Sequence, residues 1–416
     1  MKKEKVDVAI IGAGPSGAVS ASYLCQYGIK VKVIEKSKFP RYSIGESLIP
    51  RCMDNFEEAG LLDCLKAQNY QVKTGARFIK DGLESNFDFS KKFGEGWDWT
   101  WQVPRDHFDH VLAKECMRKG VDIEFESQVT DVCFTEENAT LSIENKNKET
   151  YLLEAKFVID SSGFARVLAK LLNLEAAPRI PQHSSIFAQV KDVRRPEGFE
   201  GKRITFDIIE QEVWFWYIPF SNGNTSIGFV ATNDWLPQFK GTPAQIFTEM
   251  LSLTEKYYPQ FKELPFLFEP KIVKNIAKNV TQLYGNRFVL TGNSAEFLDP
   301  VFSSGVSFAT ESGLLAAKLI LKELKGEKVD WQKEYVAYMQ EGVAVFSTYV
   351  KEWYNGNLQK IIMSQNQNLK IKEQVCAVLA GYVWNKENPF VKKHNRLVKN
   401  IAHLIDMEDN FKKNNL

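Results

Sequence analysis

The sequence of 416 residues lacks any run of about 18 apolar residues, the length that a helix needs to cross a membrane. It also lacks an excess of either charge, because 53 lysines and arginines stand against 52 aspartates and glutamates. A chain without a basic field is not expected to bind nucleic acid. The apolar run near the start is short and carries Asp7, so we expect no cleaved signal peptide. These absences predict a cytoplasmic protein whose partner is a small molecule.

Cysteine is scarce and scattered. The six cysteines form no CxxC pair and no metal-type spacing, which argues against a disulfide scaffold and predicts free, buried thiols in a reducing compartment. His107 and His110 stand three residues apart on a predicted helix, but no cysteine or carboxylate cluster completes a ligand set, so we predict no metal site. With 44% hydrophobic residues, the chain can build two or three cores at roughly 100 to 200 residues per domain.

The first forty residues follow the order of a dinucleotide-binding unit. An apolar run at 6–11 predicts a buried strand, the glycine-rich stretch 12–17 follows, and apolar positions at 18, 21 and 24 predict a helix. Gly12 permits a tight turn, Gly14 lets the backbone approach a pyrophosphate, and Gly17 lets the helix pack close to the strand. Glu35 ends the next strand, where an acid accepts hydrogen bonds from ribose hydroxyls. The predicted dinucleotide site comprises Gly12, Gly14, Pro15, Ser16, Gly17 and Glu35; a glycine-rich turn in another α/β protein is the alternative.

Further segments carry a family pattern. The stretch Lys38-Phe39-Pro40-Arg41-Tyr42-Ser43-Ile44-Gly45-Glu46-Ser47-Leu48-Ile49-Pro50 resembles the FAD-dependent halogenases and their geranylgeranyl-reductase relatives, within the wider group of FAD monooxygenases. Similar matches around 104–112, 158–166 and 292–306 extend the resemblance over nearly the whole chain. It implies FAD as the cofactor, with these additional binding residues: Lys36, Arg41, Gly45, Glu46, Ser47, Arg105, Val129, Asp160, Gly163, Gly292, Asn293, Asp299, Pro300, Ser304, Gly305 and Val306.

The segment 292–306 is the most specific match. Asn293 replaces the aspartate usual in the family, and its amide can still accept a hydrogen bond from the ribityl chain. Asp299 and Pro300 predict a turn, and Gly305 is expected to open a helix from Val306 to about Leu324. The positive end of that helix would face the flavin ring and favour its anionic reduced form.

Two features resemble the halogenases in particular. The run from Trp214 to Pro219 fits their WxWxIP pattern, and the resemblance implies that Trp214 and Trp216 shape the flavin side of the catalytic site. Read alone, the run is an alternating strand, which core packing explains equally well. Lys73 falls where the family carries its catalytic lysine, whose amine holds an oxidised halogen. Without the resemblance Lys73 is an ordinary surface lysine.

The positions of these segments predict the architecture. We expect an α/β fold with a Rossmann-like FAD-binding domain (1–75, 105–175 and 276–330), a substrate domain (76–104 and 176–275) whose mainly antiparallel sheet is what the resemblance implies, and a C-terminal helical cap (331–416). Trp97, Trp99 and Trp101 alternate within the substrate segment and predict a strand face paved with indoles. Such a face suits a flat aromatic substrate, or a helix that covers the sheet.

The leading hypothesis is a halogenase-like flavoprotein monooxygenase. As the resemblance implies, a separate flavin reductase supplies reduced FAD, and oxygen and halide then modify an aromatic or similar flat apolar substrate, free or tethered to a carrier protein. The alternatives are a flavin dehydrogenase or reductase acting on a lipid-like carbon–carbon double bond, an aromatic hydroxylase, and an FAD-stabilised binding protein.

Overall fold

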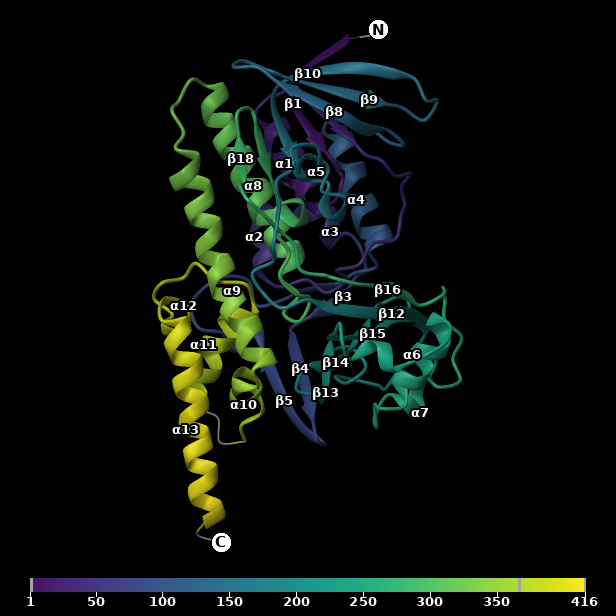
Figure 1. The fold of residues 1–416 in the computed structure, drawn as a ribbon, viewed down its shortest axis with the longest axis vertical. Helices are drawn as coiled ribbons and strands as arrows, with labels where there is room; N and C mark the ends of the chain where they lie inside the picture. The colour runs from purple at the N-terminus through teal and green to yellow at the C-terminus, as the bar shows by residue number, and fades with distance from the viewer. Residues whose placement is uncertain (1–2, 366–367, 415–416) are drawn as a thin grey trace.

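The structure, a computed structural model, describes residues 3–365 and 368–414. Two β-sheets lie one above the other, and the helices of the last fifth of the chain run along one side of both (Figure 1). The N-terminus lies at the far end of the upper sheet and the C-terminus at the opposite end of the molecule. The predicted mixed α/β class is confirmed.

The upper sheet has eight strands and a parallel centre. Its central strand β1 (Lys3–Ile11) is flanked by parallel neighbours on both sides, and its last residues are fully buried, as expected for a strand covered on both faces. The order is β18 (Tyr284–Gly285), β19 (Phe288–Leu290), β10 (Thr150–Asp160), β1, β2 (Val31–Ile34) and β7 (Asp122–Glu124), with the antiparallel pair β8 (Gln128–Phe134) and β9 (Ala139–Glu144) attached to β10.

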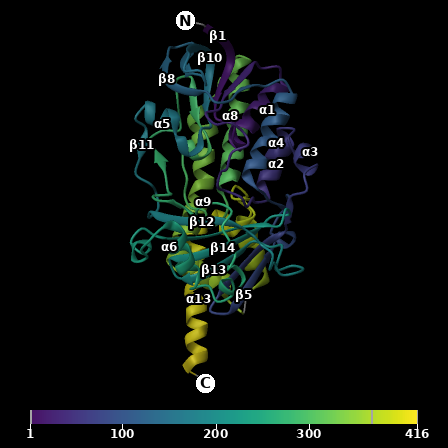
Figure 2. The same ribbon diagram turned by 90° about the vertical axis from the view of Figure 1, so that its right-hand side faces the viewer.

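Helices cover this sheet. Helix α1 (Pro15–Gln26) packs between α4 (Arg105–Arg118) and the long α8 (Gly305–Leu324) on one face, beside α2 (Arg51–Glu58) and α3 (Leu62–Lys66) (Figure 2). Gly313 makes the α1–α8 contact close, because a Cβ added there would lie 2.7 Å from the carbonyl oxygen of Ser16. The short α5 (Val167–Leu171) lies by the other face, near the two-stranded pair β11 (Glu175–Ala176) and β17 (Asn279–Val280).

The lower sheet has seven strands, and all neighbours are antiparallel except β13 and β4. Its order is β16 (Lys271–Val273), β12 (His183–Lys191), β15 (Asn224–Thr232), β14 (Val213–Pro219), β13 (Thr205–Glu210), β4 (Gly75–Lys80) and β5 (Leu83–Asp88). Helices α6 (Pro243–Leu251) and α7 (Tyr258–Phe261) cover its outer face. The predicted mainly antiparallel second sheet is confirmed.

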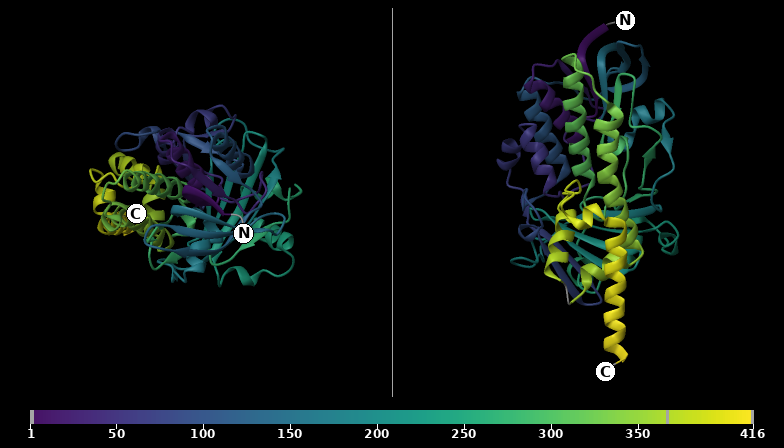
Figure 3. Two further views of the ribbon diagram at one scale, coloured as in Figure 1. Left: turned by 90° about the horizontal axis from the view of Figure 1, so that it is seen from above. Right: turned by 90° about the vertical axis from the view of Figure 1, so that its left-hand side faces the viewer.

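Most of the described residues from Gln332 onward are helical, as predicted. Buried apolar residues recur three or four positions apart along α9, which places one face of that helix against the sheets. The elements are η5 (Gln332–Ala337), α9 (Tyr338–Tyr354), α10 (Asn357–Met363), α11 (Leu369–Leu379), α12 (Pro389–Lys392) and α13 (His394–Asn414), gathered on one side of the molecule (Figure 3). Within the described residues, no helix combines the length and the apolar character needed to span a membrane.

Two sequence-based expectations need correction. All six cysteines are free thiols, and Cys52, Cys116 and Cys376 are buried as predicted. Cys25 and Cys64 are only half-buried, and the prediction is wrong for Cys133, which is exposed on β8. Of the predicted tryptophan-rich strand, only β6 (Thr100–Gln102) forms, and it pairs with the short β3 (Gln71–Lys73) outside the large sheet. Trp97 and Trp99 precede this strand, and the three indoles pack edge to face in a row.

Candidate functional site

The glycine-rich turn after β1 has the geometry that a bound pyrophosphate requires. Gly12 has φ +98°, and a Cβ there would lie 2.7 Å from the carbonyl oxygen of Ser161. At Gly17 the added carbon would lie 2.0 Å from the carbonyl oxygen of Gly12, so only glycine lets α1 approach the turn. At Gly14 it would meet only the end of the Arg41 side chain, at 3.7 Å. The turn is therefore tight on its protein side and open beside Gly14 and the start of α1, where backbone amides and the helix dipole favour an anion.

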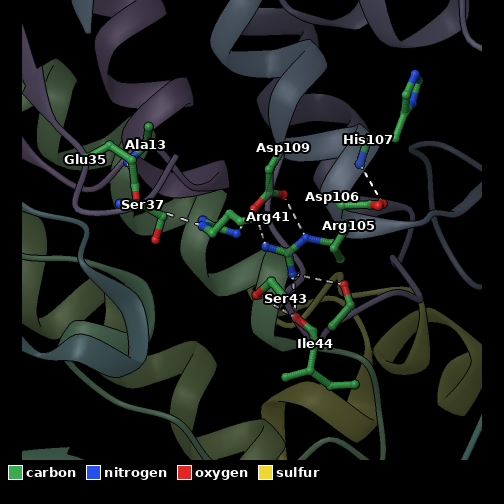
Figure 4. A network of polar contacts seen from close by, with 11 residues as sticks. Ala13, Glu35, Ser37, Arg41, Ser43, Ile44, Arg105, Asp106, His107 and Asp109 are labelled. Carbon is green, nitrogen blue, oxygen red and sulfur yellow. Dashed lines mark hydrogen bonds and ion pairs between the residues drawn. The ribbon is translucent and has the colours of Figure 1, made fainter. Parts of the chain in front are cut away.

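A network of charged side chains borders this turn (Figure 4). Glu35 accepts hydrogen bonds from the backbone amides of Ala13 and Ser37, each at 2.8 Å. A carboxylate has about four lone-pair positions, so acceptor capacity remains for ribose hydroxyls. The guanidinium of Arg41 lies between Glu35, at 3.9 Å, and Asp109, at 3.0 Å.

Arg105 opens α4 and shapes the loop that the family pattern assigns to the cofactor. Its guanidinium binds both carboxylate oxygens of Asp109, at 2.8 and 3.0 Å, and donates to the carbonyl oxygen of Ile44 at 2.7 Å and to that of Gly45 at 3.2 Å. Gly45 has φ +97° and passes so close to Arg105 that a Cβ would lie 2.9 Å from Nη1. The buried Asp109 therefore fixes two arginines, and Arg105 fixes the loop.

The segment 292–306 lies beside the glycine-rich turn because β1, β10 and β19 are parallel neighbours whose carboxyl ends meet at one edge. The Ser16 hydroxyl donates to that of Thr291 at 2.8 Å, and that of Ser161 lies within hydrogen-bonding distance of both. Gly292 follows Thr291 with φ +55°, and a Cβ added to Gly292 would lie 3.9 Å from the side chain of Ser16. Residues of this segment line a cavity, and η5 and α9 form another of its walls. The segment contributes Gly292, Asn293, Ser304 and Gly305.

Several predicted cofactor residues occupy supporting positions. The carboxylate of Asp160 accepts the backbone amides of Ser162, at 2.9 Å, and Leu168, at 2.7 Å, and so shapes the turn that contains Gly163. Val129, on β8, is buried in the core, whereas Lys36 is exposed. Asn293 is half-buried, and its backbone carbonyl oxygen accepts a hydrogen bond from Arg166 at 3.3 Å.

Glu46 and Ser47 connect the cofactor loop to the lower sheet. Gln189 on β12 donates to one carboxylate oxygen of Glu46 at 2.6 Å, and the other oxygen, also buried, has no hydrogen-bond partner among the described residues. Burial raises the pKa of Glu46 to about 7, although the nearby hydroxyl of Ser226 and the hydrogen bond from Gln189 oppose the rise. Ser226 also accepts the indole N–H of Trp216 at 3.1 Å.

Lys73 is not a surface residue. Its side chain is fully enclosed, with 3% of the residue exposed, and its amine donates to Ser47 Oγ at 2.8 Å and to the carbonyl oxygen of Leu48 at 2.7 Å. Burial, with a smaller contribution from the charge of Arg203, lowers the pKa of Lys73 to about 7. The amine therefore lies next to the cofactor loop, and near neutral pH a large fraction of it is uncharged.

The tryptophan pair lies on the inner face of β14. Trp214 and Trp216 pack into the central core, while Phe215 and Tyr217 face α6 and α7, as the period of two predicts. Both indoles are buried, and both N–H groups are already hydrogen-bonded, that of Trp214 to the hydroxyl of Tyr354 at 3.1 Å. Both indoles therefore pack in the core, and the contact of Trp216 with Ser226 places it near Glu46 of the cofactor loop.

Sequence reasoning missed three residues of this region. Asp109 stands four positions after Arg105, a spacing that predicts an ion pair on a helix. The sequence therefore held a signal for the contact between these two residues. Nδ1 of His183 lies 3.5 Å from the carboxylate of Asp299, and Tyr354 donates to the same carboxylate at 3.0 Å. These two contacts join segments more than 50 residues apart and carry no local signal.

Comparison with known proteins gives consistent matches. The family model described as FAD binding domain matches residues 5–351. A 1H-pyrrole-2-carbonyl-peptidyl-carrier protein chlorinase of Pseudomonas fluorescens is 26% identical over 412 residues, which cover 92% of this chain and 91% of the relative. The corresponding brominase of Pseudoalteromonas luteoviolacea is 27% identical over 381 residues, covering 91% and 85%.

Solved structures agree on the fold. A flavoprotein/dehydrogenase from Cytophaga hutchinsonii is 46% identical, has a TM-score of 0.96 and is matched over 98% of this chain and 100% of its own. A flavin-dependent brominase with 24% identity has a TM-score of 0.83, with 97% and 100% covered. At that identity, the second likeness concerns the fold alone.

Proposed function

The chain belongs to the FAD-binding domain family and uses FAD as its cofactor, and from this premise we propose that it is a flavin-dependent halogenase. The proposed reaction consumes reduced FAD, oxygen and halide and places the halogen on an aromatic or similar flat substrate. A separate flavin reductase would supply the reduced cofactor, since the chain carries a single dinucleotide fingerprint.

The glycine turn and its surroundings fit the cofactor. The open side of Gly14 and the amides that begin α1 would hold the pyrophosphate, and Glu35 would receive the ribose hydroxyls. The loop around Gly45 and the start of α8 would border the ring system. When bound and reduced, FAD supplies the electrons with which oxygen is activated to oxidise halide.

The observation that carries the proposal is the buried amine of Lys73. A neutral amine has two N–H groups, and Ser47 and Leu48 accept both, which leaves the nitrogen lone pair free. That lone pair can accept a hydrogen bond from hypohalous acid, or take its halogen as the oxygen–halogen bond breaks and water leaves with the amine proton. A protonated surface lysine has no free lone pair and could do neither.

The substrate is proposed from the two relatives with pyrrole substrates. By their names, they act on a pyrrole-2-carbonyl group attached to a peptidyl-carrier protein. For this chain we propose a substrate with an electron-rich ring, which arrives either free or attached to a carrier protein. Halogenation of a model pyrrole or phenol in the presence of bromide or chloride, reduced FAD and oxygen tests this step by mass spectrometry.

The relative with 46% identity is described as a dehydrogenase, so the dehydrogenase alternative needs a discriminating test. The first experiment is an anaerobic visible spectrum of the FAD-loaded protein during titration with NADH or NADPH, followed by a trace of flavin reductase. The proposal expects bleaching only after the reductase is added. Bleaching by nicotinamide alone would refute the two-component halogenase and favour a hydroxylase or dehydrogenase.

A substitution tests the role of Lys73 directly. We expect Lys73→Met to lose halogenated product while still binding FAD, because the amine is absent and the glycine-rich turn is unchanged. FAD affinity is measured alongside, since the amine also bonds Ser47 of the cofactor loop. Lys66→Met, which removes an exposed lysine on α3, is the matched control and should keep full activity. Product formation by Lys73→Met at the wild-type rate would refute the assigned role.

A further inference from the structure

Four buried polar side chains from distant segments meet at the turn that leads into α8. Trp214 donates its indole N–H to the hydroxyl of Tyr354 at 3.1 Å, and that hydroxyl donates to Oδ2 of Asp299 at 3.0 Å. The ring of His183 stacks on that of Tyr354 with the centroids 3.9 Å apart, and its Nδ1 lies 3.5 Å from the same carboxylate oxygen. None of the four residues is more than 5% exposed.

The carboxylate of Asp299 is buried without a cationic side chain beside it. Oδ1 accepts the backbone amide of Val301 at 3.0 Å, and among the described residues no lysine or arginine pairs with Asp299. Burial raises the pKa of Asp299 to about 7, while the hydrogen bonds from Val301 and Tyr354 oppose the rise. Burial also lowers the pKa of His183 to about 4, so this imidazole is neutral at pH 7. The charge of Asp299 therefore depends on hydrogen bonds alone.

The indole of Trp214 determines the direction of the Tyr354 hydroxyl. Because the hydroxyl oxygen accepts the indole N–H, its own proton is free to point at Asp299. Tyr354 is the last residue of α9, so this hydrogen bond joins the C-terminal helices to the turn at Asp299 and Pro300. That turn continues directly to Ser304 and the first residue of α8.

The inference rests on the proposed FAD site, which includes this turn. We propose that Tyr354 is a positioning residue for that site: its hydroxyl keeps the carboxylate of Asp299 charged and directed at the amide of Val301, and so fixes the path of the chain into Ser304 and Gly305. In this role Tyr354 contacts neither substrate nor cofactor, because it acts through Asp299.

FAD affinity as a function of pH tests the inference. The dissociation constant is measured by quenching of FAD fluorescence from pH 6 to pH 9 in the wild type, Tyr354→Phe, Tyr349→Phe and Asp299→Asn. In the wild type we expect binding to weaken as pH falls through about 7, because the charged carboxylate is the form that holds the turn. Loss of a hydrogen bond to a charged group should move this midpoint upward by about one to two pH units in Tyr354→Phe. Affinity at pH 7.5 should then fall about tenfold.

Tyr349 provides a matched control. It is fully buried on the same helix, five positions before Tyr354, and its hydroxyl has no hydrogen-bond partner among the described residues. Tyr349→Phe thus removes the same atom without affecting Asp299, and its profile should match the wild type. Lys73 and Glu46 also titrate near neutral pH, so a step that persists in Asp299→Asn belongs to them.

The outcomes separate the inference from the function on which it rests. Identical profiles for Tyr354→Phe and Tyr349→Phe overturn the positioning role while leaving FAD binding intact. If Tyr354→Phe does not fold, by circular dichroism, the comparison of wild type with Asp299→Asn decides, and an unchanged step in the latter overturns the inference. A wild-type protein that binds no FAD at any pH overturns the proposed function itself.

Discussion

Replacement of Lys73 by methionine should stabilise the protein in a way that depends on pH. Burial lowers the pKa of this amine from 10.5 to about 7, so the folded protein releases a proton that the unfolded chain keeps. Each pKa unit corresponds to about 1.4 kcal/mol, so holding the charged amine in the core costs on the order of 5 kcal/mol below pH 7. Methionine fills a similar volume and carries no charge to bury. It also removes the donor to the carbonyl oxygen of Leu48, a cost that is the same at every pH and therefore cancels when two pH values are compared.

The sign follows from the two protonation states. Below pH 7 both folded and unfolded chains carry the proton, and the full cost is present. Between pH 7 and pH 10.5 the unfolded chain binds more protons than the folded one, so the stability of the wild type rises with pH. The advantage of Lys73→Met over the wild type should therefore shrink by roughly 3 kcal/mol between pH 6 and pH 9.

Urea unfolding of both proteins at pH 6, 7, 8 and 9, with FAD absent, measures this difference. Groups other than residue 73 titrate alike in both proteins and cancel in the comparison. Lys66→Met, at an exposed position, should differ from the wild type by less than about 0.5 kcal/mol at every pH. An advantage of Lys73→Met that is equal at pH 6 and pH 9 would show that folding does not deprotonate this amine, and the argument for a free lone pair would fail.

Three other predictions concern the cofactor region. Gly17→Ala should unfold at lower denaturant concentration and lose FAD, since its Cβ would lie 2.0 Å from a backbone oxygen. Gly14→Ala should fold normally and bind FAD more weakly. Thermal melting together with FAD titration distinguishes the two variants. Asp109→Asn leaves two guanidinium groups without their carboxylate and should lose about 3 kcal/mol of unfolding free energy in urea. Glu46→Gln should gain stability relative to the wild type as pH rises from 5 to 8, because burial raises the pKa of Glu46 to about 7 and the charged form is the costly one; equal differences at both pH values would contradict this.

The cofactor turn was predictable because its constraints are local. A positive φ at Gly12 and the close approach at Gly17 both arise within six residues of chain, and no side chain but hydrogen satisfies them. The placement of Glu35 follows from the length of one helix and one strand. The same holds for the start of α8 at Gly305, which lies where the sequence predicts it.

The tryptophan-rich segment shows where such reasoning fails. Alternation of Trp97, Trp99 and Trp101 predicts a strand, but only the last of them lies in β6. A period of two indicates which side chains lie on the same side of an extended chain. It does not indicate whether a neighbouring strand is available to pair with that chain. The indoles instead pack edge to face on one another.

The sequence by itself determined the dinucleotide-binding turn and the strands and helix around it, since backbone conformation and hydrophobic periodicity act over a few residues. Its resemblance to a known family implied FAD and the second, mainly antiparallel sheet. Only the tertiary structure decided which side chains meet and in what charge state. Lys73 becomes a buried amine because β3 pairs with β6 and the loop at Ser47 covers it. His183 and Tyr354 reach Asp299 from segments 116 and 55 residues away, and burial by those segments sets the pKa of the carboxyl group. Desolvation depends on everything that surrounds a group, and the residues next to it in sequence supply only a small part of those surroundings.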